Sequence, residues 1–302
     1  MNLTKVNRRH FIRSGLLTAG AIGSGLVNPL TVFSQTKPDL TIAHGPDPYR
    51  TALKAVAMLG GIERFVRRGD TVLLMPNIIS PSPPQFAVNT NPNVVRAVAE
   101  LCVRAGGDVH VYHHHDPTYA KAIGVQDAVE RVGASMVHMP SAEEAPERYL
   151  EVPVPMGRVL STIRVADLIL KADVFINIPI AKHHAGSELT MAMKNLMGVV
   201  SDPQSWHSLG LHDCIADGST AIRPDLVVMD ATTILLTNGP SGPGETRRVN
   251  EVIASTDPVA VDAYGASLLK KEVRDVPFIT QAFKQRVGEM RLNLLAVERA
   301  NA

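Results

Sequence analysis

Cysteine is scarce in this sequence, because the 302 residues contain only Cys102 and Cys214. Two thiols cannot supply the ligands of a cysteine-bound iron–sulfur cluster or of a four-cysteine zinc site, and they exclude a disulfide-dense scaffold. Aromatic residues are also rare, at 4% with a single Trp, which argues against a platform on which single-stranded bases or sugars stack. We therefore expect no iron–sulfur cluster in this chain.

Net charge of one sign is lacking as well. Lys and Arg number 30 and Asp and Glu 29, so the formal net charge is +1. Phosphate backbones are bound by clustered cations, so nucleic acid is not an expected partner. The sequence also has no Gly-x-Gly-x-x-Gly after its first predicted strand, no Walker lysine pattern and no Gly-x-Ser-x-Gly elbow, which argues against dinucleotide, P-loop nucleotide and serine-hydrolase sites.

The first 34 residues resemble a twin-arginine export signal. Arg8 and Arg9 precede Phe11 and an uncharged, mildly apolar run over 14–26. That run is shorter than the roughly 20 residues that span a bilayer. Small or branched residues at 32–34 suit a processing site, so we expect cleavage after Ser34.

This interpretation predicts the twin-arginine translocase as a partner during export. It places the mature protein in the periplasm or another extracytoplasmic compartment, without a stable transmembrane segment after cleavage. The alternatives are an N-terminal anchor and a disordered basic tail. Residues 35–302 are then expected to form a single domain, since no linker is convincing; the polar stretch Pro146–Pro155 is the best candidate for a linker or an insertion.

Strand-length apolar runs alternate with helical periodicity along this domain. Several runs are apolar throughout, which is typical of strands buried on both faces of a largely parallel sheet. The expected fold class is α/β, a three-layer, mostly parallel sheet with helices on both faces. The predicted strands are Leu40–Ala43, Thr71–Met75, Asp108–Tyr112, Ser135–His138, Val174–Ile178, Leu226–Met229 and Val252–Ser255, and the clearest predicted helices are Tyr49–Phe65, Asn93–Ala105 and Val259–Lys270.

Helix starts are marked by an Asp or Asn before a proline, because the side chain caps the helix and proline suits its first turn. This pattern occurs at Asp47, Asn91, Asp116 and Asp257. Capping is therefore the favoured role of Asp116 and Asp257. The segment after Phe278 is expected to be helical and basic.

Polar or reactive residues follow most of the predicted strands. If the strands are parallel, these residues meet at the carboxyl edge of the sheet, where open α/β sheets bind ligands. They are Pro76-Asn77, His113–Asp116, Pro179–His184, Asp230 and Thr256-Asp257. Of His113, His114 and His115, one or two can point into a shared site, because adjacent side chains diverge in extended backbone.

The densest of these stretches resembles the DUF362 family, a domain of unknown function. The resemblance covers roughly residues 40–270 and rests on an ordered series of motifs. The matching residues are Pro76-Asn77, Asn89–Pro92, Lys182, His184, Leu189-Thr190, Lys194–Gly198, His212, Asp217, Pro224, Asp230, Gly239-Pro240, Gly242 and Asp257–Asp262. Met75 and Ile180 stand where the family pattern has lysines, and Asn91 where it has histidine, which suggests a less anionic ligand or altered chemistry.

Lys182, His184, Lys194 and His212 are the candidate catalytic residues. Lysines pair with carboxylate or phosphate, and an inward-pointing lysine in the apolar segment 189–197 would need a partner. Histidine can transfer a proton near neutral pH. The alternatives are that Lys182 and Lys194 are ordinary loop or surface charges and that the histidines hold loops by bonding to the backbone.

A divalent metal is a further possibility, and three more residues are candidate ligand-binding groups. His184, His212, Asp217 and Asp230 are the residue types of a mixed nitrogen and oxygen site, although their spacing forms no compact motif. Asn77 and Asn195 could orient a ligand by hydrogen bonds or form turns. Asp262 is listed with them because an acid inside an apolar helix is costly unless it is paired.

The sequence thus favours an exported enzyme that binds a small anionic metabolite through lysines and uses histidine for proton transfer, with or without a metal. The alternative is a non-catalytic metal- or ligand-binding accessory protein of a periplasmic redox system. A third interpretation treats the polar residues as caps and turns of a fold without a site.

Overall fold

A mixed, mostly parallel β-sheet runs through the molecule between two layers of helices. The computed structural model describes residues 37–302, so the predicted export signal lies outside it. The strands are β1 (Leu40–His44), β2 (Thr71–Pro76), β3 (Asp108–His113), β4 (Ser135–His138), β5 (Tyr149–Pro153), β6 (Thr162–Ala166), β7 (Val174–Ile178), β8 (Ile180–His184), β9 (Glu188–Thr190), β10 (Leu226–Leu235), β11 (Thr246–Ser255) and β12 (Val297–Asn301).

The helices connect these strands and cover both faces of the sheet. They are α1 (Pro48–Met58), α2 (Pro92–Arg104), α3 (Thr118–Ala122), α4 (Val125–Glu130), α5 (Asp167–Lys171), α6 (Ala192–Asn195), α7 (Ser205–Leu209), α8 (Leu211–Ala221), α9 (Pro258–Leu268) and α10 (Pro277–Lys284). Short 3₁₀ turns lie at Ile62–Arg64, Pro84–Phe86, Pro146–Arg148, Leu196–Val199, Val273–Asp275 and Leu292–Leu294. No helix within 37–302 is long and apolar enough to cross a membrane.

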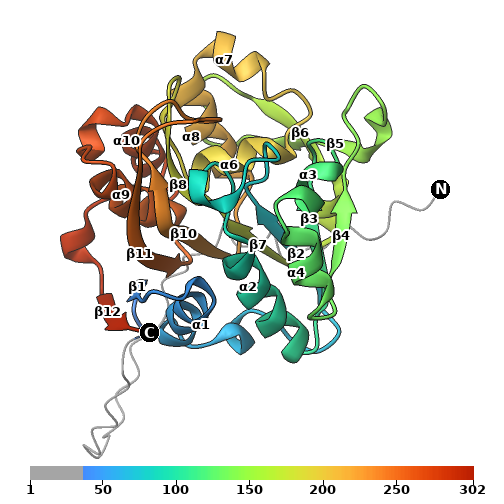
Figure 1. Cartoon of the computed structure of the whole chain (residues 1–302). Helices are drawn as coiled ribbons and strands as arrows, with labels where there is room; N and C mark the ends of the chain where they lie inside the picture. The colour runs from blue at the N-terminus through green and yellow to red at the C-terminus, as the bar shows by residue number, and fades with distance from the viewer. Residues whose placement is uncertain (1–36) are drawn as a thin grey trace, which may run out of the picture.

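The strand order is β12-β1-β11-β10-β7-β2-β3-β4, and β8 joins β10 beyond the end of β7 (Figure 1). The neighbours β10, β7, β2, β3 and β4 all run parallel. Their carboxyl ends therefore share one edge. β11 is antiparallel to both β10 and β1, and a separate two-stranded sheet pairs β5 with β6.

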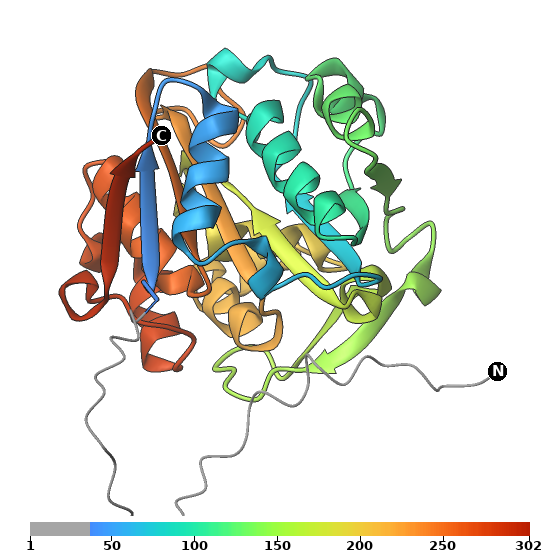
Figure 2. The same cartoon turned by 90° about the horizontal axis from the view of Figure 1, so that it is seen from below.

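Successive residues of the central strands enter two different hydrophobic cores, as the period of two requires. Val72 and Leu74 of β2 pack with α1, α2 and α4, whereas Leu73 and Met75 pack in the larger core that contains α8, α9 and α10. Figure 2 shows α1 and α2 in front of the sheet and α9 on its other side. The predicted three-layer α/β fold is confirmed.

The expected helix caps are present because each side chain accepts the free amides of the first turn. Asp47, Asn91 and Asp257 do so for α1, α2 and α9, and Asp116 accepts the backbone N–H of Thr118. The predicted helix over 49–65 is shorter in the structure and ends before Gly60 and Gly61, which both have positive φ.

Three sequence predictions about local structure were wrong. The Pro146–Pro155 stretch is no linker, since it contains β5, which pairs with β6. The segment after Phe278 is helical only to Lys284, and its end forms β12 beside β1. Asp257 does not reach the common edge, because β11 runs antiparallel to β10 and so ends on the opposite side of the sheet.

Candidate functional site

Three chain segments meet beyond the carboxyl ends of β2, β3 and β7. Asn77 follows β2, His115 lies just beyond β3, and β8 leaves β7 after Pro179. Sequence analysis treated 179–184 as a loop, whereas it is a strand that pairs with β10 and β9. As a strand, β8 directs successive side chains to opposite sides, so Lys182 and His184 share one side and His183 takes the other.

Lys182 is a completely buried lysine. Its exposed fraction is 0%, and its Nζ donates hydrogen bonds to Asn77 Oδ1 at 2.9 Å and to the Val88 carbonyl at 2.6 Å. Burial, reinforced by the charge of Lys194, holds the Lys182 pKa well below its ordinary value. Lys182 therefore holds the segment over 77–91 in place and does not face solvent.

A chain of amide hydrogen bonds links Lys182 to the helix that carries Lys194. Asn77 Nδ2 donates to Asn195 Oδ1 at 2.7 Å, and Asn195 Nδ2 donates to Asn177 Oδ1 at 2.8 Å. Asn177 Nδ2 in turn donates to the carbonyl of Ala192 at 2.8 Å. The predicted ligand-binding residues Asn77 and Asn195 thus bond to the protein itself, and the relay fixes α6 relative to β2 and β7.

Asp262 anchors the other side of α6. Its carboxylate accepts the backbone N–H groups of Ala192 at 2.7 Å and Met193 at 3.0 Å. Burial raises the Asp262 pKa to about 7, although these two hydrogen bonds oppose the shift. The predicted ligand-binding role is not what this geometry supports, because the oxygens of Asp262 bond to the backbone at the start of a four-residue helix.

Lys194 projects from this anchored helix and is only partly buried. Within residues 37–302 its amine forms no hydrogen bond and no ion pair, in contrast to Lys182. Burial lowers the Lys194 pKa to about 8, so an appreciable fraction of the amine is neutral near physiological pH. An unpaired, partly desolvated lysine is available to a ligand.

His184 is held in one tautomer by its own loop. Its Nδ1 accepts the backbone N–H groups of Gly186 at 3.0 Å and Ser187 at 3.2 Å. An Nδ1 that accepts hydrogen bonds carries no proton, so the neutral ring carries its hydrogen on Nε2. Burial and the charge of Lys194 lower the His184 pKa to about 3, so the ring is neutral at pH 7 and offers an N–H donor.

Five side chains form what we call the lysine–histidine cluster: Lys182, Lys194, His184, His207 and His115. The charge of Lys194 lowers the pKa of His184 and of the exposed His207, after the larger effect of burial. Lys182 acts in the same way on His115. The rings of His184 and His207 stack with centroids 6.2 Å apart. Every charge named among these effects is positive, so a bound anion would offset the mutual repulsion.

The other histidines after β3 point elsewhere, as divergent neighbours should. His113 packs against His138 with ring centroids 5.1 Å apart, and burial lowers its pKa to about 4. His114 lies against Gly198, where an added Cβ would come within 2.8 Å of its ring. The hydroxyl of Tyr112 donates to the Gly198 carbonyl at 2.7 Å. These contacts fix the turn that follows α6.

His212, a predicted catalytic residue, is not a member of the cluster. Its ring stacks on Phe278 with centroids 5.8 Å apart. The charges that act on it are those of Glu188 and Asp213, which oppose the lowering of its pKa by burial. Its buried Nδ1 has no hydrogen-bond partner within 37–302. His212 therefore lies in a different electrostatic environment from the lysines.

The four-residue metal site predicted from His184, His212, Asp217 and Asp230 is not assembled. In the described part of the chain no three His, Cys, Asp or Glu side chains are placed to share a metal ion. Asp217 accepts the backbone N–H groups of residues 158–160 and the amide of Gln285. Asp230 accepts from the backbone of Asn91 and from the backbone and hydroxyl of Thr232. Both carboxylates are already used in holding loops.

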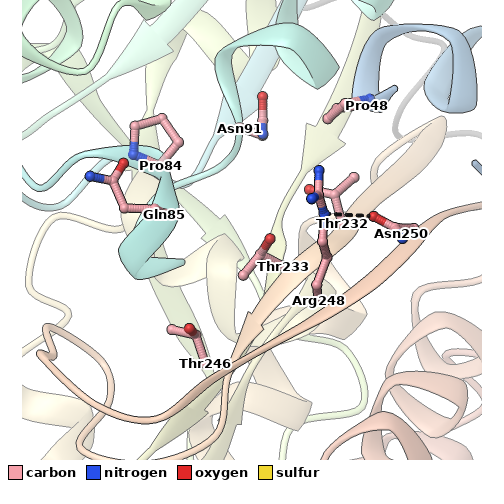
Figure 3. Close-up of a pocket in the computed structure, with 9 residues that line it drawn as sticks. All are labelled: Pro48, Pro84, Gln85, Asn91, Thr232, Thr233, Thr246, Arg248 and Asn250. Atoms are coloured by element: carbon pink, nitrogen blue, oxygen red, sulfur yellow. Dashed lines mark hydrogen bonds between the residues drawn. The ribbon is translucent and has the colours of Figure 1, made fainter. Parts of the chain in front are cut away.

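A cavity of about 410 Å³ lies on the far side of the 77–91 segment (Figure 3). Pro84 and Gln85 face the β10–β11 hairpin across it, and Arg248 is its one cationic lining residue. A small apolar cluster of Ala87, Val88, Ile180 and Leu235 packs beneath the same segment. None of the five residues of the lysine–histidine cluster lines this cavity.

Sequence reasoning missed three residues that matter here. His207 and His115 were noted in the sequence but given no role, and Asn177, which completes the amide relay, was not considered. The signal for His115 was its place directly after a predicted strand. Asn177 lies inside an otherwise apolar strand, where a fully buried amide needs partners.

Comparison with known proteins gives three findings. The model of the family "Domain of unknown function (DUF362)" matches residues 72–267. The thylakoid-associated protein sll1697 of Synechocystis sp. is 32% identical over 249 residues, which cover 80% of this chain and 74% of that one. A lactate racemase apoprotein from Thermoanaerobacterium thermosaccharolyticum aligns with a TM-score of 0.46 at 11% identity, over 77% of this chain and 57% of that one.

The family match extends from β2 to α9 and includes the residues of the lysine–histidine cluster. It also includes the amide relay and Asp262, which anchor α6. On the family match and on the similarity to the Synechocystis protein, the chain belongs to the DUF362 family.

Proposed function

We propose that this protein is an exported enzyme that binds a small anionic metabolite at the lysine–histidine cluster and transfers a proton there. The observation that carries the proposal is the meeting of Lys182, Lys194 and His184 at one edge, with no carboxylate of residues 37–302 paired with either amine. Buried cations without counter-ions are costly, and a bound anion removes that cost.

The residues of the cluster take different roles in this proposal. Lys194 is the reachable amine, and with a pKa of about 8 it can attract the anion when charged and accept a proton when neutral. His184 donates a hydrogen bond from Nε2, because its Nδ1 already accepts two backbone N–H groups. Lys182 is a positioning residue that reaches the site through Asn77 and the amide relay.

This assignment differs from the sequence expectation in two ways. His184 is a hydrogen-bond donor and not a base, since a proton added at Nδ1 would displace the N–H groups of Gly186 and Ser187. A divalent metal held by His184, His212, Asp217 and Asp230 has no part in the proposal, because the hydrogen bonds of both aspartates hold loops.

The test measures binding and turnover separately. We expect isothermal titration calorimetry to show oxalate binding to the mature protein, weakened about tenfold or more by Lys194→Met. Lys54→Met, at an exposed position on α1, is the matched control and should bind as the wild type does. Equal oxalate affinity in wild type and Lys194→Met would contradict the proposal.

The catalytic part is tested with a panel of small carboxylic acids in D₂O. Proton transfer predicts exchange of a carbon-bound hydrogen with solvent, detected by NMR and lost in Lys194→Met. Tight, Lys194-dependent binding without any exchange would favour the non-catalytic accessory protein and would overturn the enzyme.

A further inference from the structure

We infer that Lys194 forms an imine with the carbonyl carbon of a 2-oxo acid, while the Nε2–H of His184 binds the carbonyl oxygen. This inference rests on the proposed function, because the carboxylate of such a substrate is the anion that the cluster attracts. It adds a substrate class and a covalent step. The argument has three parts: the nucleophile, the group that polarises the carbonyl, and the path to solvent.

The nucleophile is the amine of Lys194. Lysine attacks carbonyls only as the neutral amine, and enzymes obtain that form by desolvating the side chain or placing another cation beside it. Lys194 is mostly shielded from water, has no carboxylate partner within 37–302 and shares the cluster with Lys182. Most surface lysines have none of these features.

The position of this amine is fixed from both sides. Asp262 accepts the N–H groups of the two residues that begin α6, and Asn195, directly after Lys194, is held by Asn77 and Asn177. A reacting group needs this kind of placement, because loss of orientation lowers the rate steeply. A lysine with no catalytic task would not require a buried acid and three buried amides around its helix.

The group that polarises the carbonyl is the neutral imidazole of His184. Its Nδ1 faces its own loop, so Nε2–H is the only ring donor left. A neutral imidazole can act as the electrophile toward a carbonyl oxygen when its environment keeps it unprotonated. Lys194 and His184 interact electrostatically, so one substrate carbonyl can meet the amine at carbon and the ring at oxygen.

The path to solvent runs past His207. This residue is exposed, stacks on the His184 ring and also feels the charge of Lys194. It therefore marks the open side of the cluster, while Lys182 closes the inner side. A 2-oxo acid entering there places its carboxylate among positive and imidazole groups.

The chemical step is balanced without a further reagent. The lone pair of Lys194 Nζ forms a bond to the carbonyl carbon, and the C=O π pair moves to the oxygen, which His184 Nε2–H stabilises. Proton transfers from solvent and from the nitrogen then release the oxygen as water and leave a protonated imine. Hydrolysis reverses the same bonds and regenerates the amine.

The experiment uses pyruvate as the 2-oxo acid and sodium borohydride to reduce the imine to a stable amine. We expect mass spectrometry of the digested protein to find one reduced pyruvate on the peptide that contains Lys194. Lys194→Arg keeps the positive charge and should lose this adduct, while Lys54→Arg on α1 should trap as the wild type does. Uniform labelling of surface lysines, with none in excess at Lys194, would overturn the inference.

A matched pair at His184 tests the second contact. His184→Asn retains an acceptor near the Nδ1 position for the Gly186 and Ser187 N–H groups but lacks the Nε2 donor, whereas His184→Gln can place an N–H near Nε2. We expect trapping to slow about a hundredfold in the Asn variant and to recover largely in the Gln variant. Equal trapping rates in wild type and the Asn variant would remove His184 from the step.

Oxalate separates failure of this inference from failure of the proposed function. Oxalate resembles a 2-oxo acid but has no ketone and cannot form the imine, so its binding reports the anion site alone. Lys194-dependent oxalate binding without pyruvate trapping would overturn the imine and leave the proposed function standing. If neither occurs, both are wrong.

Discussion

Two lysines twelve residues apart in the sequence have opposite environments in the structure. Lys182 is completely buried and donates to Asn77 and Val88, whereas the amine of Lys194 forms no hydrogen bond or ion pair within 37–302. Sequence analysis gave both residues the same role because their type and motif are equivalent. The difference arises from the 77–91 segment, which covers Lys182 and not Lys194.

Lys194 gives a prediction about pH. Its pKa is lowered from 10.5 to about 8 in the folded protein, so between these values the unfolded chain binds more protons. The free energy of unfolding of the wild type, relative to Lys194→Met, should therefore rise as pH rises from about 8 to about 10.5. Urea unfolding of both proteins at several pH values measures this difference, and a difference that falls over the range would contradict the assigned environment.

His184 gives a prediction about protonation. With a pKa of about 3 and an Nδ1 that accepts two N–H groups, its ring should stay neutral, with the hydrogen on Nε2, across pH 5–8. ¹⁵N NMR of labelled histidine distinguishes the two ring nitrogens and their protonation. Titration of His184 near pH 6.5, as for an ordinary histidine, would show that the loop does not hold this tautomer.

At the scale of elements, α6 is a four-residue helix that carries the reachable amine. So short a helix has little stability of its own, because nucleation is costly. Asp262 from α9 and Asn195 through Asn77 and Asn177 supply hydrogen bonds that hold it. Its geometry therefore depends on residues far away in the sequence.

Asp262 supplies a prediction at this scale. Its pKa of about 7 lies above the ordinary 3.8, so the folded protein retains a proton that the unfolded chain releases between these values. The free energy of unfolding of the wild type, relative to Asp262→Asn, should fall as pH rises from about 4 to about 7. Chemical denaturation at pH 4.5 and pH 7.5 checks the sign, and an increase over that range would count against the assignment.

Asp217 supplies a second prediction, for the segment before β6. It accepts the backbone N–H groups of Arg158, Val159 and Leu160 and the amide of Gln285. Asp217→Ala leaves these donors without their acceptor and should cost about 3 kcal/mol of unfolding free energy. The control Asp127→Ala, at an exposed position on α4, should cost well under 1 kcal/mol by the same urea titration. A loss at Asp217 no larger than that of the control would show that a metal-ligand role was dismissed too early.

At the scale of the whole molecule, the segment over 77–91 divides two polar regions. One side supplies Asn77 and the Val88 carbonyl to Lys182, and the other supplies Gln85 and Asn91 to the cavity beside Arg248. Asn91 also donates to the buried Asp230 of β10. The segment is thereby attached to both halves of the sheet.

Export is the prediction that concerns the chain as a whole. Arg8→Lys with Arg9→Lys should leave the precursor in the cytoplasm, because the twin-arginine translocase reads the arginine pair and not charge alone. Fractionation and immunoblotting of an affinity-tagged chain measure the distribution, with Arg13→Lys as the matched control. Normal export of the double variant would refute this route, and its arrest would leave the chemistry of the site untouched.

The sequence by itself determined the layers, the central strands and the caps. Continuous apolar runs such as 72–75 and 174–176 require burial on both faces, and Asp or Asn before proline begins a helix wherever the rest of the chain lies. These features are local, so spacing and residue type suffice to predict them. The motif around Lys182–Gly198 likewise located the site before any coordinates.

Only the tertiary structure decided which of the predicted residues meet. Strand direction sends Asp257 to the opposite edge, and hydrogen bonds to residues 58 or more positions away commit Asp217 and Asp262 to the backbone. Neither direction nor long-range pairing is encoded in local periodicity. The division of roles between Lys182 and Lys194 is of the same kind, because a lysine's burial depends on the segment that folds over it.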